Sequence, residues 1–368
     1  MSDLLYSEAE NDLRAAVRSL LADRCDAPAV LARVESDTPY DQRLWASLAT
    51  EMGLAGLLVP EKLGGQGATH REAAVVLEEL GRSVAPAPYL TSAVIATETL
   101  LACDTQDETV AELLGALAGG RTVAVLAVPL SAAPGAALSG TVRADGNGLL
   151  VGRITGVADA AAATVLLVPA QDGLYAVETG ADGVSVDALT PLDLTRPLAA
   201  VNLEGARGRR LAASADAPVR RGLLAGAGLL ASEQLGVAEW CLEEVVRYTR
   251  DRKQFNRPVG SFQALKHRMA QLWLQVVSAR AAARNAADAL ATGATDAPLA
   301  VALAQAYCSR VAVRAAEECV QLHGGIGMTW EHPAHLYLKR AKSDEIVLGS
   351  PGRHKEAIAD LVDLRGPR

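Results

Sequence analysis

The chain has 368 residues, of which 50% are hydrophobic and only 4% aromatic, and its formal net charge is −8. A chain of this length can form two or three domains and bury a large core. The negative charge argues against nucleic acid as a partner, and no apolar run approaches the roughly 20 residues that a bilayer span requires. The N-terminus has neither the basic nor the apolar region of a secretory signal peptide, so we expect a cytoplasmic protein.

Cysteine usage agrees with that location. The sequence has no Cys-x-x-Cys pair and no histidine at ligand spacing from a cysteine, and its five cysteines are scattered: Cys25, Cys103, Cys241, Cys308 and Cys319. An odd number of cysteines without a signal peptide indicates reduced, buried thiols. From this spacing we expect no metal site.

Residues 1–118 are predicted to form an N-terminal α-helical domain. Ser7 precedes a run with apolar residues at helical spacing, and Glu10 follows three residues later, which is the pattern of a capping box. Farther along, Thr69 follows a glycine-rich loop and is expected to cap the next helix. Alanine and leucine dominate the chain and favour helix.

Residues 119–213 change character and are predicted to form a central β-domain. Short apolar runs begin near Thr122, Gly148, Ala163 and Gly173, and clusters of proline, glycine and aspartate separate them at roughly even spacing. Runs of this length between turn residues are typical of strands.

Residues 214–368 are predicted to be a C-terminal α-helical bundle. Long helical patterns cover 222–250 and 261–291, a third follows the linker at 292–298, and a last one covers 334–346. Long helices joined by short loops are typical of a four-helix bundle. The expected fold class is therefore α+β and multi-domain, mainly α.

Several motifs resemble those of the acyl-CoA dehydrogenase family, and together they span nearly the whole chain. The C-terminal ones are Gln321-x-x-Gly324-Gly325-x-Gly327, Glu331-x-Pro333, Arg340-Ala341-Lys342 and Gly349-Ser350. The N-terminal ones are Val59-Pro60-Glu61-x-x-Gly64-Gly65-x-Gly67 and Glu78-Glu79-Leu80-Gly81. The resemblance implies a helical N-terminal domain, a small central β-barrel and a C-terminal four-helix bundle.

The catalytic base of the family is missing from the matching positions. In the family a glutamate removes the α-proton of an acyl-CoA while the flavin of FAD accepts the β-hydride. Leu348 occupies the usual glutamate position, and leucine cannot accept a proton. Some family members carry the glutamate on the preceding long helix, where Gly226 stands here. We therefore predict no catalytic residue in this chain, with Glu345 and Glu233 as less favoured, relocated bases.

A second group of residues resembles the half-site that the family lends to a neighbouring subunit. In the family an arginine at the position of Arg252 reaches the pyrophosphate of the neighbour's FAD, and a planar guanidinium suits phosphate oxygens. The resemblance implies that these residues bind FAD across a subunit interface: Arg252, Phe255, Gln263, Gln321, Gly324 and Gly325.

The chain's own flavin-ring segments depart from the family pattern. The usual Thr-Glu-Pro…Gly-Ser-Asp loop is replaced by the run from Pro129 to Leu138, and the usual Trp-Ile-Ser/Thr run by Gly152 to Asp159. Trp240 and Trp330 are expected in the core rather than against a flavin. His332 and His335 are interpreted as polar contacts at a surface or an interface.

These departures favour the non-catalytic subunit of a heterotetrameric, steroid side-chain type acyl-CoA dehydrogenase. Its partner subunit would carry the catalytic glutamate, the substrate would be a bulky acyl-CoA, and an electron-transferring flavoprotein would accept the electrons. Two alternatives stay open. One is a homomeric FAD-dependent enzyme with a relocated base, and the other is a non-enzymatic binding or scaffold protein with the same fold.

Overall fold

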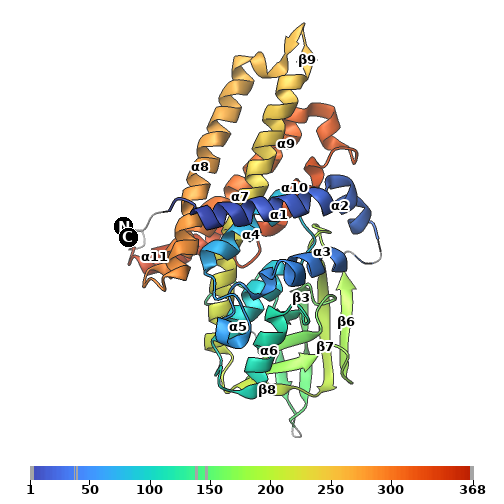
Figure 1. Ribbon diagram of the computed structural model, residues 1–368, viewed down its shortest axis with the longest axis vertical. Helices are drawn as coiled ribbons and strands as arrows, with labels where there is room; N and C mark the ends of the chain where they lie inside the picture. The colour runs from blue at the N-terminus through green and yellow to red at the C-terminus, as the bar shows by residue number, and fades with distance from the viewer. Residues whose placement is uncertain (1–3, 37, 39, 137–139, 146–147, 365–368) are drawn as a thin grey trace.

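The computed structural model describes residues 4–36, 38, 40–136, 140–145 and 148–364. The molecule is elongated, with strands β1 to β8 at one end and the tip of a long helical hairpin at the other (Figure 1). That hairpin consists of α7 (Asp216–Asp251) and α8 (Gln263–Ala291). None of the described helices is both long and apolar enough to cross a membrane.

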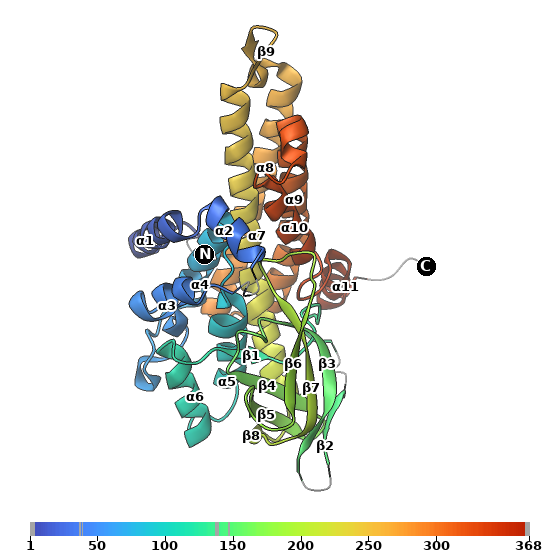
Figure 2. The same cartoon turned by 90° about the vertical axis from the view of Figure 1, so that its right-hand side faces the viewer.

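The N-terminal part is helical, as predicted, and lies beside α7 (Figure 2). Its α-helices are α1 (Glu8–Arg24), α2 (Ala27–Val34), α3 (Gln42–Ala46), α4 (His70–Arg82), α5 (Thr97–Leu101) and α6 (Glu108–Ala118). Shorter helical segments are η1 (Ser47–Glu51), η2 (Leu54–Gly56), η3 (Glu61–Leu63) and η4 (Tyr89–Ala96). Both expected caps are confirmed, because Ser7 and Thr69 form capping boxes with Glu10 and Glu72.

The central β-domain contains two four-stranded sheets. One has the order β1-β4-β5-β8 and the other β2-β3-β7-β6, and only the β1–β4 pair is parallel among the described strands. The strands are β1 (Ala124–Leu126), β2 (Val142–Ala144), β3 (Leu150–Ala158), β4 (Val165–Ala170), β5 (Gly173–Glu178), β6 (Val184–Leu189), β7 (Leu198–Ala206) and β8 (Arg209–Ala212).

The fold class is confirmed, but the expectation of a closed β-barrel is wrong. No strand pair in the described part of the chain joins the two sheets. The longest pairing, β3 with β7, has register shifts near Leu150 and between Ile154 and Val157, where the ladder is interrupted. Sequence patterning predicts individual strands, but closure depends on pairing at the sheet edges, which the pattern does not specify.

The C-terminal part is a bundle in which α7, α8 and α9 run side by side (Figure 2). Its remaining elements are β9 (Lys253–Gln254), β10 (Arg257–Pro258), η5 (Val259–Ser261), α9 (Ala297–His323), η6 (Gly324–Met328), α10 (Ala334–Asp344) and α11 (Pro351–Leu361). Helix α4 crosses α7 at very close range: a Cβ at Gly236 would lie 1.9 Å from the carbonyl oxygen of Glu78. Only glycine permits that approach.

A buried cluster of charged residues joins the β-domain to two helices of the bundle. Arg340 of α10 donates to Asp193, in the loop before β7, and to Glu233 of α7, each at 2.5 Å. Arg196 donates to Glu233 and to Asp344, each at 2.6 Å. All five side chains are at most 6% exposed. Such charges are costly to bury singly, so each depends on its partners.

We predict that Arg340→Met destabilises the protein by about 3–5 kcal/mol, because it leaves Asp193 and Glu233 buried beside one fewer positive charge. The matched control is Lys342→Met on the same helix, whose ion pair with Glu317 has side chains 39% and 52% exposed. We expect that control to cost less than about 1 kcal/mol. Denaturant unfolding followed by circular dichroism measures both, and equal midpoints for the two variants would contradict the structural role of the cluster.

Candidate functional site

Leu348, which the resemblance places at the position of the family's catalytic base, lies in a turn whose backbone N–H and carbonyl groups both contact neighbouring segments. Its side chain is 1% exposed and its φ is 55°. Its backbone N–H donates to the carbonyl oxygen of Leu130 at 2.8 Å, and its own carbonyl oxygen lies 3.0 Å from Nε2 of His354. The turn that would present a glutamate is thus sealed against the loop that follows β1.

Gly226, the alternative base position, faces the same place from α7. A Cβ at Gly226 would lie 3.2 Å from Cδ1 of Leu348 and 2.6 Å from Cγ1 of Ile95. The two positions are therefore neighbours in space, although more than a hundred residues separate them in sequence. Neither has a carboxylate, and the space around Gly226 is already filled by apolar side chains.

What remains between these residues is a very small, apolar void. Its volume is about 20 Å³, and no carboxylate of the described residues lines it; the lining residues are Thr91, Ile95, Leu126, Val128, Leu130, Ala158, Leu223 and Leu348. One probe-sized water needs roughly 10–15 Å³, so the void holds at most about one water. A substrate carbon and its base have no room here.

One buried acid beside this void was missed by the sequence reasoning. Asp159 follows β3 and is 6% exposed, and the hydroxyl of Thr91, which lines the void, donates to its carboxylate at 2.6 Å. Burial raises the pKa of Asp159 above its ordinary value despite that hydrogen bond. From the sequence, residues 152–159 are interpreted only as a segment that departs from the family's flavin-contacting run. No local pattern indicates that Asp159 is buried.

The two less favoured candidate bases, Glu233 and Glu345, lie away from the void at Leu348. Glu233 is 2% exposed and bound by Arg196 and Arg340. Burial alone would raise its pKa, but the two arginines outweigh burial and hold it below the ordinary value. Glu345 follows α10 and lines an outer groove with Tyr307 and Glu317 of α9. Neither lines the void around Leu348.

The far tip of the α7–α8 hairpin contains β9 (Figure 1), and Arg252 and Phe255 directly precede and follow this strand. Arg252 is the C-cap of α7, and the two-residue loop Phe255-Asn256 joins β9 to β10 with φ of 53° and 58°. Two consecutive positive φ values define a type I′ turn, which a bulky aromatic residue rarely adopts. Phe255 is nevertheless 85% exposed, so burial of its ring does not offset the energetic cost of this backbone conformation.

Gln263 lies at the start of α8, just beyond this turn. It is exposed, and its amide nitrogen lies 3.4 Å from Nε2 of His267. Phe262 precedes it and packs edge-on against Phe255, with ring centroids 6.1 Å apart, while the Arg257 guanidinium stacks on the Phe262 ring. These contacts support the tip and leave Arg252 and Gln263 exposed to solvent.

Gln321, Gly324 and Gly325 lie at the end of α9, next to the last turns of α7. The ring of His323 lies 4.3 Å from that of Tyr248, whose carbonyl oxygen accepts the Arg252 N–H. All three residues are exposed, and a Cβ added at either glycine would meet no atom within 4 Å. The structure therefore brings the C-terminal motif and the hairpin motif to one end of the bundle.

This end of the bundle is also unusually apolar on its surface. Met328 is 78% exposed, Trp330 67% and Ile326 42%, alongside Phe255. The expected core position of Trp330 is wrong, because the residue lies on the surface with Lys339 over its ring. Trp240 instead stacks on the buried Tyr337 at 3.5 Å. Exposed apolar groups gathered around polar ones are typical of a protein interface.

The FAD that the resemblance implies is compatible with only one of these two regions. At Leu348 the Leu130 loop and the turn are hydrogen-bonded together, and the void of about 20 Å³ between them is too small for a flavin ring. A separate cavity of about 200 Å³, lined by Pro129 and Ile154 among others, shares Val128 and Leu223 with that void. Residues 137 and 138 of the replaced loop lie outside the described residues. At the bundle end, an exposed guanidinium and two open glycines suit a phosphate group.

Comparisons with known proteins agree over the whole length. Residues 7–121 match the acyl-CoA dehydrogenase N-terminal domain, and residues 218–362 match the acyl-CoA dehydrogenase C-terminal domain. The chain is 37% identical over 346 residues to acyl-CoA dehydrogenase IpdE2 of Mycolicibacterium smegmatis, covering 94% of this chain and 96% of the relative.

Two solved structures are similar over nearly every residue. The ChsE4-ChsE5 complex from Mycobacterium tuberculosis contains a chain with a TM-score of 0.87 and 28% identity, covering 100% of both chains. A variant of the Tcur3481-Tcur3483 steroid acyl-CoA dehydrogenase gives a TM-score of 0.85 and 29% identity, covering 97% of this chain and 98% of that one. Domain matches, the full-length relative and these structures together establish that the chain belongs to the acyl-CoA dehydrogenase family.

Proposed function

We propose that this chain is the subunit of a heteromeric acyl-CoA dehydrogenase that has no catalytic base of its own and completes the FAD site of a partner subunit. The family is FAD-dependent in general and acts on acyl-CoA thioesters. The observation that carries the proposal is the contact between Leu348 and Gly226. Both positions at which the family carries its base meet there, and both are apolar.

The chemistry of the reaction explains why that contact matters. Dehydrogenation removes an α-proton to a carboxylate and a β-hydride to the flavin that FAD supplies. A general base must lie within hydrogen-bond reach of the proton that it takes. The void at Leu348 has neither an acid in its lining nor room for a thioester. In the proposal the partner therefore provides the base, the flavin-ring segments and most of the acyl-CoA pocket.

The contribution of this chain is electrostatic and positional. Arg252 is exposed, and no ion pair within the described chain neutralises it, so its forked donors are available to pyrophosphate oxygens. Gly324 and Gly325 allow the backbone to approach the same cofactor closely, and Gln321 offers an amide beside them. Phe255, Met328 and Trp330 supply apolar area that an adjoining subunit would cover.

The names of two structural neighbours support the heteromeric assembly and a bulky substrate. One structure is a complex of ChsE4 with ChsE5, and the other pairs Tcur3481 with Tcur3483 and is called a steroid acyl-CoA dehydrogenase. We extend this to the present chain as a proposal: the substrate is the thioester of a steroid side chain or a similarly bulky acyl group. An electron-transferring flavoprotein is the proposed acceptor.

The homomeric alternative requires a catalytic base within this chain, and Asp159 is the residue at which that requirement can be tested. It is the buried acid joined through Thr91 to the void at Leu348, and burial raises its pKa, which is the direction of change that favours a general base. For it to act, the Leu130 loop would have to separate from Leu348 and open the site. We favour the heteromeric proposal because the present hydrogen bonds hold that loop closed.

We predict that Arg252→Ala lowers the FAD content of the complex formed with the partner. Loss of a charge-assisted contact worth about 1.5–3 kcal/mol weakens FAD binding roughly 10- to 100-fold. Arg250→Ala, which removes another exposed arginine two residues away on the last turn of α7, is the matched control. Flavin absorbance per complex after gel filtration reports occupancy. Unchanged occupancy in Arg252→Ala would exclude the cofactor role.

We further predict that the purified chain alone dehydrogenates no acyl-CoA, and that co-expression with the partner gives a yellow, active complex. In that complex Asp159→Asn and Leu348→Ala should change turnover per bound flavin less than about twofold, although truncating a buried leucine costs about 2–5 kcal/mol of stability. Dye reduction with a steroid acyl-CoA is the assay. Activity of the isolated chain that Asp159→Asn abolishes would establish the homomeric alternative. A chain that binds no FAD and activates no partner would be a scaffold.

A further inference from the structure

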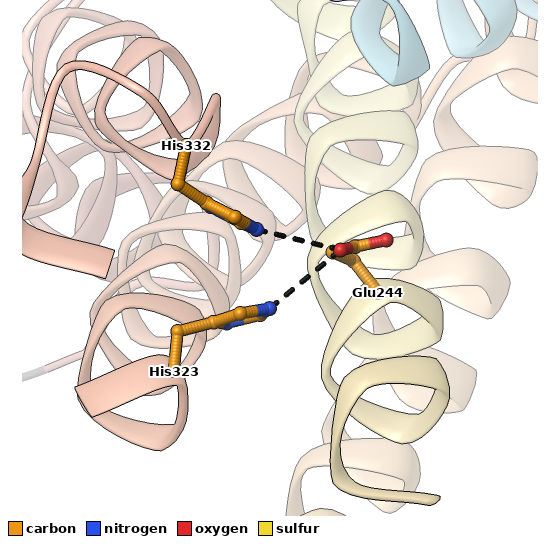
Figure 3. Close-up of side chains that lie close together, drawn as sticks. All are labelled: Glu244, His323 and His332. Carbon is orange, nitrogen blue, oxygen red and sulfur yellow. Dashed lines mark ion pairs between the residues drawn. The ribbon is translucent and has the colours of Figure 1, made fainter. Parts of the chain in front are cut away.

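Three potential metal ligands from separate parts of the C-terminal bundle converge beside the end of α9 (Figure 3). Glu244 projects from α7, His323 from the last turn of α9, and His332 from the segment between η6 and α10. One ligand atom from each lies within 4.8 Å of the other two. The cysteine and histidine spacing in the sequence predicted no metal site, because these residues are brought together only by the fold.

His323 has the burial and ring orientation of a metal ligand. It is 3% exposed, and its Nδ1 donates to the carbonyl oxygen of Cys319 at 2.7 Å, so Nε2 is the nitrogen that faces Glu244. Burial lowers the pKa of His323, but Cys319 and Glu244 outweigh burial and raise it to about 9, so a metal ion at Nε2 competes with a proton. Nε2 is buried, has no hydrogen-bond partner among the described residues and points toward Glu244. A metal-ligating histidine typically has its other ring nitrogen bonded to a carbonyl or carboxylate in this way.

The separations between the ligand atoms are those of ion pairs between Glu244 and the two histidines, and they are also compatible with a shared cation. Oε1 of Glu244 lies 3.6 Å from Nε2 of His323 and 3.4 Å from Nε2 of His332. A charge-assisted hydrogen bond would be about 2.7–2.9 Å long. Zinc bonds of about 2.0–2.2 Å at tetrahedral angles place neighbouring ligand atoms about 3.3–3.5 Å apart. The imidazole rings lie 4.1 Å apart, and two neutral rings tolerate that distance better than two protonated ones.

Two further contacts, one at Glu244 and one at His332, affect how strongly the site can bind a cation. Arg247 bonds both oxygens of Glu244, which fixes the carboxylate but places a positive charge beside the site. The Ala334 N–H lies 3.2 Å from Nδ1 of His332, a contact that is lost when Nδ1 takes the proton and Nε2 binds metal. Both effects oppose every cation at these atoms, and a borderline-soft transition metal, which bonds imidazole strongly, is the class best able to bind despite them.

We propose that Glu244, His323 and His332 bind one divalent transition-metal ion of the zinc class, with a fourth position left for water. Glu244 and His332 side chains are each 12% exposed, so a cation and its water can enter from their side. The bound ion links α7 to the segments on both sides of η6, and so fixes the turn that contains Gly324 and Gly325. This inference goes beyond the proposed function and does not depend on it.

The test is titration of the chelator-treated, full-length chain with Zn²⁺ by calorimetry, and with Co²⁺ by visible absorption. We expect one ion per chain, four-coordinate Co²⁺ spectra, a higher Tm with Zn²⁺, and no comparable binding of Mg²⁺ or Ca²⁺. Glu244→Gln and His332→Gln should each weaken Zn²⁺ binding more than about 100-fold, since even outer-sphere changes cost about 10- to 100-fold.

Matched controls separate this site from adventitious binding. Glu243→Gln changes the adjacent acid of α7, which pairs with Arg82, and His335→Gln changes a histidine outside the cluster. Cys319→Ser tests thiol binding, because its Sγ lies on the Nδ1 side of His323. All three should retain Zn²⁺ affinity. Absence of stoichiometric Zn²⁺ binding, or binding that Glu244→Gln and His332→Gln leave intact, would overturn the proposal.

Discussion

The packing of Leu348 against Gly226 and the Leu130 loop is the constraint on which this account depends. In the family, either of two positions presents a carboxylate to the substrate, and here both positions contact each other through apolar atoms. A carboxylate introduced there would lose solvation without a partner, which is costly in an apolar site. The hydrogen bond from the Leu348 N–H to the carbonyl oxygen of Leu130 holds the loop after β1 against the same turn.

The end of the bundle around Arg252 and Phe255 has an exposed, partly apolar surface rather than a closed apolar contact. Phe255 is held in a left-handed conformation that its own burial does not repay, and Met328 and Trp330 are largely exposed. Strained and exposed groups of this kind are usually stabilised by what binds them. In the proposed heteromeric complex an adjoining subunit would bury this apolar area around Arg252.

Local sequence signals predicted much of the fold and of this surface. Ser7 and Thr69 cap their helices as predicted, and the family resemblance singled out Leu348 and Gly226 as residues without a carboxylate. Properties that depend on distant pairing were not accessible. The open sheets, the exposed Trp330, the buried Asp159 and the meeting of Glu244 with two histidines follow from tertiary packing rather than from spacing along the chain.

The proposed division of labour between two unlike subunits has a direct consequence for stoichiometry. If this chain lends Arg252 to a partner's cofactor and binds no flavin ring of its own, each pair of chains contains a single FAD. The decisive measurement is the ratio of flavin to protein in the co-purified complex, from quantitative absorbance and amino-acid analysis. The account predicts one FAD for every two chains, and two FAD for every two chains would contradict it.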